Sequence, residues 1–257
     1  MTHPNWLSQH LLSKIDTLSS QYQVRLLTTA SDYAAYQALY DDAFTPWGFQ
    51  LPDMAALVTP TNPVLIIVNR NNQMPIGGLQ IRCFDENTPD GGFCHGALFK
   101  LDTLPREVLS RSFELNGLCI HPDHKNGRSF LLLFKAIKCF ATVAGVESLL
   151  GGIRICVDNM RDAIAFCDSH YQAGYGHPDF QIAPNEHIAD DDTVTLPVNP
   201  EDDKSDTLLT FYLRNNGKLL TPYPCREKPP LCYSAMILMP VANMLPRFSG
   251  HLTVGHP

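Results

Sequence analysis

Residues 113–129, FELNGLCIHPDHKNGRS, decide how this chain folds, because they join a strand to a helix through a short polar turn. The run 113–120 begins with apolar side chains at every second position, which is typical of a strand. Pro122, Asn126 and Gly127 then favour a turn, and the apolar run 130–144 that follows at once predicts a helix. The stretch therefore predicts a strand, a turn and a helix in direct succession.

This turn has the composition of an anion site. Backbone N–H groups and the helix dipole attract negative charge at a helix N-terminus. Gly127 would let the backbone approach a phosphate closely, and Lys125 and Arg128 would add positive charge. Lys135 and Lys138 extend the positive charge along the helix, or form its solvated face. A glycine turn before a helix is also common without a ligand, so both interpretations stay open on these residues alone.

The flanking pattern predicts a mixed α/β sheet rather than an even alternation of strands and helices. Apolar runs and turn residues predict strands at 24–28, 64–69, 76–85, 113–120, 148–155 and 232–239. Helical spacing predicts helices at 5–19, 31–44 with Ser31 as N-cap, 130–144, 158–170 and 206–215.

The composition argues against a nucleic-acid-binding surface, a disulfide-bonded scaffold and a membrane span. The chain has 257 residues, 44% of them hydrophobic, and a net charge of −7. Residues 185–206 hold eight acidic side chains and one lysine, so the acidity is local and no broad basic surface for nucleic acid is expected. Eight cysteines without a CxxC motif indicate reduced thiols. With no apolar run of about 18 residues and no signal-like start, we expect a cytoplasmic protein without a membrane span.

Further residues carry a family resemblance. His124, Gly127 and Ser129 stand where the GNAT superfamily of acyltransferases has its Gln/Arg-x-x-Gly-x-Gly/Ala loop, with the middle glycine kept. Downstream, a second set is similar to the pattern that closes GNAT domains: Asn159, Ala163, Phe166, Gly174 and Tyr175. The resemblance spans about residues 24–177. It implies a GNAT-like α/β (α+β) fold, with a mixed, mostly antiparallel sheet flanked by helices.

Within that superfamily the chain looks most like the branch that transfers long acyl chains, namely ornithine-lipid acyltransferases, N-acyl amino acid synthases and acyl-homoserine-lactone synthases. Residues 39–44, LYDDAF, resemble their Leu-Arg-Tyr-x-x-Phe helix without its arginine. Residues 113–122 resemble Glu-Leu-x-Arg-x-x-Val-His-Pro, with Gly117 in place of arginine. Residues 208–217, LLTFYLRNNG, resemble a helix that follows the core in the ornithine-lipid enzymes.

The resemblance implies roles for individual residues. Glu114 would be the general base that deprotonates the amine, and an apolar cleft would raise its pKa. Backbone N–H groups near Cys119 and Ile120 would polarise the thioester carbonyl. Five loop residues would hold the phosphate of the pantetheine arm: Lys125, Asn126, Gly127, Arg128 and Ser129. No metal is expected.

Alternatives remain for several side chains. Glu114 could be a salt-bridged residue of the sheet, and Tyr171 and Tyr175 could be acids for the thiolate or packing residues. Cys119 with His121 two residues on could be a nucleophile pair, although a buried thiol is favoured. A metal site from scattered ligands fits no zinc spacing: Cys94, His95, His121 and His124.

The resemblance favours an N-acyltransferase that moves a medium or long acyl chain from an acyl-carrier-protein or acyl-CoA thioester to an amino acid or related amine. An acidic acyl carrier protein is the expected partner. A homoserine-lactone-type signal synthase and a non-catalytic acyl-thioester-binding protein remain alternatives. We expect four parts: an N-terminal helix in 1–22, a GNAT-like core in 23–177, an acidic flexible insertion in 178–206, and a helix–strand extension in 207–257.

Overall fold

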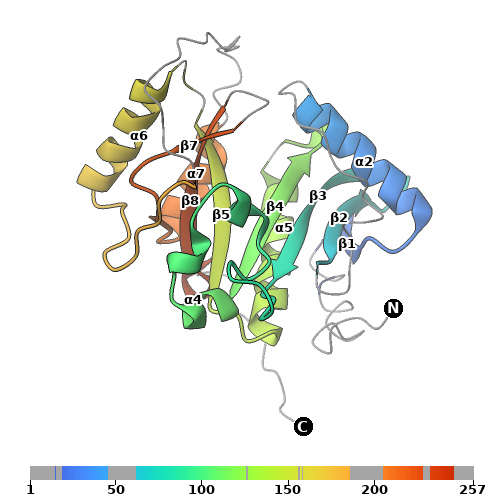
Figure 1. The fold of residues 1–257 in the computed structure, drawn as a ribbon. Helices are drawn as coiled ribbons and strands as arrows, with labels where there is room; N and C mark the ends of the chain where they lie inside the picture. Colours follow the sequence, from blue (N-terminus) through green and yellow to red (C-terminus); the bar gives the residue numbers. More distant parts are fainter. Residues whose placement is uncertain are drawn as a thin grey trace. The chain divides into compact units, whose positions relative to one another are not determined.

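The computed structural model describes residues 15, 19–45, 62–125, 127–155, 157, 159–185, 205–227 and 232–245 (Figure 1). The chain forms two compact units. The first comprises residues 1–83, 115–146 and 245–257, and the second comprises residues 84–114 and 147–244. The predicted core 23–177 thus contributes to both units, and the predicted part boundaries stay predictions. The predicted helix 5–19 and most of the acidic stretch, 186–204, lie outside the described residues.

The first unit is built on strands in the order β1-β2-β3-β4. Their bounds are β1 Tyr22–Leu26, β2 Val64–Asn69, β3 Pro75–Cys83 and β4 Ser112–Ile120, whose first residues belong to the second unit. β2 is antiparallel to both β1 and β3. The sequence VLIIVN places β-branched and apolar side chains on both faces of β2, and a strand of this composition is stable where both faces are covered.

Helices cover both faces of this strand set. Tyr36 and Leu39 of α2 (Ala30–Phe44) form one core cluster with Val64, Ile66 and Val68 of β2. The alternate residues of β2 point to the opposite face and are fully buried as well. The apolar helix α5 (Arg128–Val143) contacts β1, β2 and β3. This unit therefore holds β4, the turn after it and the start of α5 against a well-packed core.

The second unit is built around β8 (Cys232–Pro240). β8 pairs antiparallel with β5 (Ser148–Ile155), and also with the short strands β6 (Lys218–Leu219) and β7 (Cys225–Glu227). The helices of this unit are α4 (Arg106–Ser110), α6 (Met160–Gln172) and α7 (Ser205–Arg214). α6 contacts β8, and α7 contacts β5.

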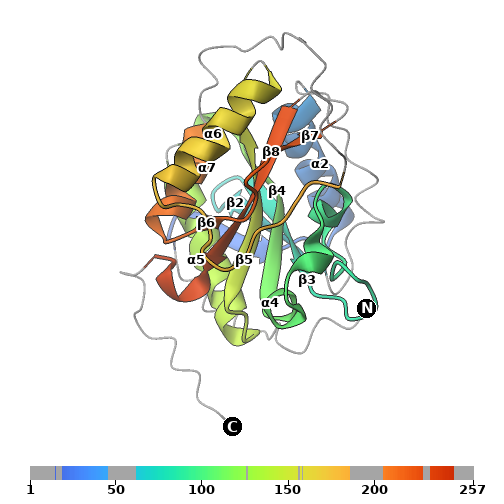
Figure 2. The ribbon, with the colours of Figure 1, turned by 60° about the vertical axis from the view of Figure 1, so that its left-hand side comes forward.

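The two faces of β5 carry different elements. On one face, Leu150 packs in a cluster with β8 and with the irregular segment 93–109, which contains α4 and two 3₁₀ helices, Cys94–Ala97 and Leu101–Thr103. On the other face, the side chain of Tyr212 in α7 lies directly against Gly151. Figure 2 shows α4 and α7 on opposite sides of β5 and β8. Segment 93–109 is thus held against a strand whose reverse side is closed by a helix.

The predicted mixed, mostly antiparallel sheet flanked by helices is confirmed. β2 and β5 have the predicted bounds, 64–69 and 148–155, and the other predicted elements that are described differ by one to two residues at their ends. The N-cap of α2 differs: Thr29, not Ser31, accepts the N–H of Asp32 at 3.1 Å. None of the described helices is long and apolar enough to cross a membrane.

Candidate active site

The turn between β4 and α5 places a glycine at the N-cap of the helix. Gly127 has φ 78° and ψ −23°, in the left-handed region, and makes no side-chain hydrogen bond to the first turn of α5. A Cβ at Gly127 would meet nothing within 4 Å, so the space beside it is open. The first N–H groups of a helix have no partner within it. Lys125 and Arg128 are exposed beside them.

Two contacts fix this turn. The hydroxyl of the buried Ser129 donates to the carbonyl oxygen of His124 at 2.6 Å. Nδ1 of His124 lies 3.3 Å from the hydroxyl oxygen of Tyr22 in β1. The predicted loop residues Lys125, Gly127, Arg128 and Ser129 thus lie in one turn, and Asn126 lies outside the described residues. Their role in binding an anion stays a prediction.

Gly117 interrupts β4 between the predicted base and the turn. Its φ is 63°, and Tyr36 donates its hydroxyl hydrogen to the Gly117 carbonyl oxygen at 2.9 Å. A Cβ here would lie 3.0 Å from the Tyr36 hydroxyl oxygen and 3.1 Å from the ring of Tyr40. Where the resemblance places an arginine, the backbone of this chain thus accepts only glycine without strain.

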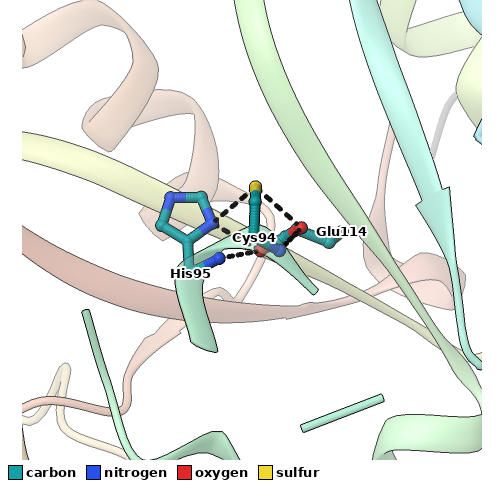
Figure 3. Close-up of side chains that lie close together, drawn as sticks. All are labelled: Cys94, His95 and Glu114. Carbon is teal, nitrogen blue, oxygen red and sulfur yellow. Dashed lines mark hydrogen bonds and ion pairs between the residues drawn. The ribbon is translucent and has the colours of Figure 1, made fainter. Parts of the chain in front are cut away.

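Glu114 lies at the centre of a polar cluster in the second unit, shown in Figure 3. Its side chain is fully buried, and both of its oxygens accept hydrogen bonds from the dipeptide Cys94-His95. The backbone N–H of Cys94 donates at 2.7 Å and that of His95 at 2.9 Å. The Cys94 thiol donates at 3.0 Å, and Nδ1 of His95 lies 2.5 Å from Oε1. One carboxylate thus binds two backbone and two side-chain donors.

These groups form a buried ion pair. Burial alone would raise the pKa of Glu114, but the neighbouring His95 charge and the hydrogen bonds lower it overall. Burial alone would lower the pKa of His95, but the Glu114 carboxylate raises it well above its ordinary value. Burial and the Glu114 charge raise the pKa of the Cys94 thiol. At neutral pH the favoured state is therefore carboxylate, imidazolium and neutral thiol.

A known family model matches the part of the chain that contains this strand–turn–helix segment. Residues 61–135 match the model of the acetyltransferase (GNAT) domain. The matched segment contains β2, β3, β4, the Cys94-His95 dipeptide, Glu114 and the start of α5. This segment, less than half of the chain, is similar to the GNAT domain. The predicted resemblance is thereby confirmed, and with it the expectation of an acyltransferase fold.

Solved structures with similar folds include several acyltransferases. FeeM, an N-acyl amino acid synthase from uncultured soil microbes, is 10% identical with a TM-score of 0.50, over 88% of this chain and 95% of that chain. The AHL synthase LasI is 10% identical with a TM-score of 0.48, over 89% and 96% of the two chains. At such identities the likeness shows the fold alone. No curated protein matches the chain by sequence.

The geometry changes the role that sequence predicts for Glu114. The expectation that an apolar cleft raises its pKa is wrong: the pKa is lowered, because a histidine and hydrogen-bond donors surround the carboxylate. Both oxygens already accept hydrogen bonds, so a substrate amine would have to displace one of them. Of the two interpretations of Glu114, its ion pairing is observed, whereas its action as base stays a prediction.

Neither Cys94 nor Cys119 is placed as a nucleophile. Burial raises the pKa of Cys119 to about 12, and its thiol points to the Gly78 carbonyl oxygen at 3.8 Å. Cys94 lies 3.8 Å from Nδ1 of His95, the same nitrogen that faces Glu114. A nucleophile–histidine–acid triad needs the thiol and the acid at different ring nitrogens. The favoured interpretation of Cys119 as a buried thiol agrees with its burial.

The distances within this cluster can be compared with those of a metal site and with those of a hydrogen-bond network. Among the described residues, only Cys94, His95 and Glu114 gather enough ligand atoms for a metal ion, without His121 or His124. Tetrahedral zinc would hold nitrogen and oxygen ligands roughly 3.3 Å apart, from bond lengths near 2.0 Å. His95 Nδ1 and Glu114 Oε1 are 2.5 Å apart, which is a hydrogen-bond distance. The cluster therefore has the geometry of a proton-sharing network.

We expect this ion pair to make stability depend on pH. The contribution of His95 is complete below its ordinary pKa of 6.5 and is lost as pH rises through its raised pKa. The contribution of Glu114 is complete above its ordinary pKa of 4.5 and is lost as pH falls through its lowered pKa. Thermal melts between about pH 6 and pH 10 should show a decline in Tm that is steeper in the native protein than in His95→Gln. Parallel declines would contradict the ion pair.

Proposed function

We propose that this protein is an N-acyltransferase that moves a medium or long acyl chain from a carrier-protein or coenzyme A thioester to the amino group of an amino acid or related amine. The observation that carries the proposal is the N-terminus of α5 behind the left-handed Gly127, with open space beside it, within the matched segment 61–135. Such a terminus suits the phosphate of a pantetheine arm, because the N–H groups and the dipole at a helix N-terminus favour negative charge.

The surface beside this turn supports a carrier protein as donor. Leu131, one helical turn after Gly127, is 42% exposed, and Lys125 and Arg128 are exposed on either side of Gly127. An acidic carrier protein would meet both positive charge and an apolar side chain there. Coenzyme A would need only the phosphate-binding turn. Lys138 is less suited to docking, because its ammonium group is partly buried and donates to the Leu245 carbonyl oxygen at 3.5 Å.

The direct experiment measures thiol release. Purified protein is incubated with acyl-carrier-protein and acyl-CoA thioesters and with single amino acids, and free thiol and acylated amine are quantified together. Amine-dependent release supports the acyltransferase and identifies donor and acceptor. Donor binding without release from any pair would favour the acyl-thioester-binding protein, and a lactone product would favour the signal synthase.

Charge reversal at the turn should separate the two donors. We expect Arg128→Glu to raise KM for both thioesters at least tenfold, because it places negative charge at the phosphate. Leu131→Asp should raise KM for the carrier-protein thioester several-fold and leave KM for the coenzyme A thioester unchanged. The control is Arg161→Glu, an exposed arginine in the first turn of α6 in the second unit. Equal effects of Leu131→Asp on both donors would contradict docking of a carrier protein at this surface.

A further inference from the structure

We propose that His95, held by Glu114, is the general base of the reaction: Nε2 of its imidazole takes the proton from the attacking amine, and Glu114 is a positioning residue. This inference rests on the proposed function. It transfers the proton-accepting role from the carboxylate to the side chain that the carboxylate orients.

The first argument is the orientation of the ring. A carboxylate only accepts hydrogen bonds, so Nδ1 of His95, 2.5 Å from Oε1 of Glu114, must carry a hydrogen. Glu114 also binds the backbone N–H groups of Cys94 and His95, which fixes the main chain that carries the ring. With Nδ1 engaged, any proton exchange with a substrate has to use Nε2. In Figure 3 this second nitrogen lies on the side of the ring turned away from Cys94 and Glu114.

The second argument is the place of the His95 ring against β5 and its partial exposure. A Cβ at Gly152 would overlap Nε2 of His95, so the ring edge occupies the place where a side chain of β5 would stand. The His95 side chain keeps 15% of its surface exposed, whereas the Glu114 side chain is 0% exposed. Of the two members of the pair, only the His95 side chain is therefore partly exposed.

The third argument is electrostatic. Among the described residues, the titratable groups in contact with His95 are Glu114 and Cys94. Asp90 lies against the neighbouring Gly96, and Arg154 is two residues beyond Gly152 on the same face of β5. Glu114 is in direct contact and raises the pKa of His95. The form that acts as base is the neutral imidazole with its hydrogen on Nδ1, which becomes the major form as pH rises above this raised pKa. A base with a raised pKa is better matched to an ammonium acceptor, whose own pKa lies well above 7.

The proposed step conserves atoms and electrons. The amine nitrogen forms a bond to the thioester carbonyl carbon, and its proton passes to Nε2 of His95. The carbon–sulfur bond then breaks, the sulfur leaves with the electron pair, and Nε2 returns the same proton to it. The products are an amide and a free thiol, with the imidazole back in its starting state. No other reactant is needed.

The experiment compares pH profiles of thiol release with the donor and amine that the native protein uses. In the native protein kcat/KM should rise with pH and level off above a pKa higher than 6.5. His95→Gln should lower kcat by about 100-fold or more and abolish this inflection, while Kd for the donor stays unchanged. Glu114→Gln should move the inflection down toward the ordinary histidine value, because the negative charge beside Nδ1 is lost.

Two further variants guard against effects of misfolding. Gly152→Ala keeps both members of the pair but displaces Nε2, so kcat should fall while the inflection remains. His170→Gln is the matched control, since His170 is a half-buried histidine whose ring contacts Phe166 within α6, and its kcat should stay native.

The outcomes separate the two proposals. Native protein without release from any thioester would overturn the proposed function, and this inference with it. Native turnover with an unchanged kcat and inflection in His95→Gln would overturn this inference alone, and would leave His95 and Glu114 as an anchor for residues 94–97.

Discussion

Replacing Glu114 with alanine is expected to lower the free energy of unfolding by about 3–5 kcal/mol, the usual cost of removing one partner of a buried ion pair. The change leaves the backbone N–H groups of Cys94 and His95 and the imidazolium without their acceptor. Buried donors without an acceptor cost stability, because in the unfolded chain water satisfies them. Urea unfolding followed by circular dichroism gives the free energy directly.

Glu147 provides a matched control for this prediction. It is also a glutamate in an ion pair, 2.7 Å from Arg111, but its side chain is 63% exposed and that of Arg111 is 61% exposed. Exposed pairs contribute little, so Glu147→Ala should change the free energy of unfolding by less than about 1 kcal/mol. If the two variants lose similar stability, the buried network at Glu114 does not hold the second unit together.

Gly117→Ala is expected to lower the free energy of unfolding by about 2–4 kcal/mol. The substitution forces a φ of 63° on a residue with a side chain. It also presses the new methyl group against Tyr36 and Tyr40, and Tyr36 is fully buried and hydrogen-bonded to the same residue. The backbone and the side chains therefore both oppose the change.

Gly145→Ala separates the cost of backbone strain from the cost of the clash with Tyr36 and Tyr40. Gly145 follows α5 with φ 68°, and a Cβ there meets nothing within 4 Å. Its substitution by alanine should cost only the backbone strain, about 1–2 kcal/mol. If Gly117→Ala and Gly145→Ala lower the free energy of unfolding equally, Tyr36 and Tyr40 must move aside to accept the new methyl group. In that case an arginine at position 117 would be excluded by backbone strain alone.

The sequence predicts elements well where local pattern decides them. The apolar run of β2 and the run of β5 have the predicted bounds, because composition and turn residues define their ends. The elements of segment 93–109 escape prediction, since two 3₁₀ helices and the five-residue α4 are too short to show a period. Their structure depends on contacts with β5 and β8 instead.

The candidate site could be predicted only in part. The turn at Gly127 follows from neighbouring residues, and the geometry there agrees with a local prediction. The partner of Glu114 could not be found in the same way, because His95 lies 19 residues away and is brought back by segment 93–109. A signal was present in the glycine pair 151–152: successive glycines inside a strand indicate close approach of another group.

That glycine pair has a consequence for how homologues vary. Position 151 is restricted by the ring of Tyr212 in α7, and position 152 by the imidazole of His95 on the reverse face. Substitutions at 151 should therefore covary with the residue at 212 and be indifferent to position 95, and those at 152 should show the opposite dependence. Two adjacent positions of β5 would thus vary independently in homologues, one with α7 and the other with His95.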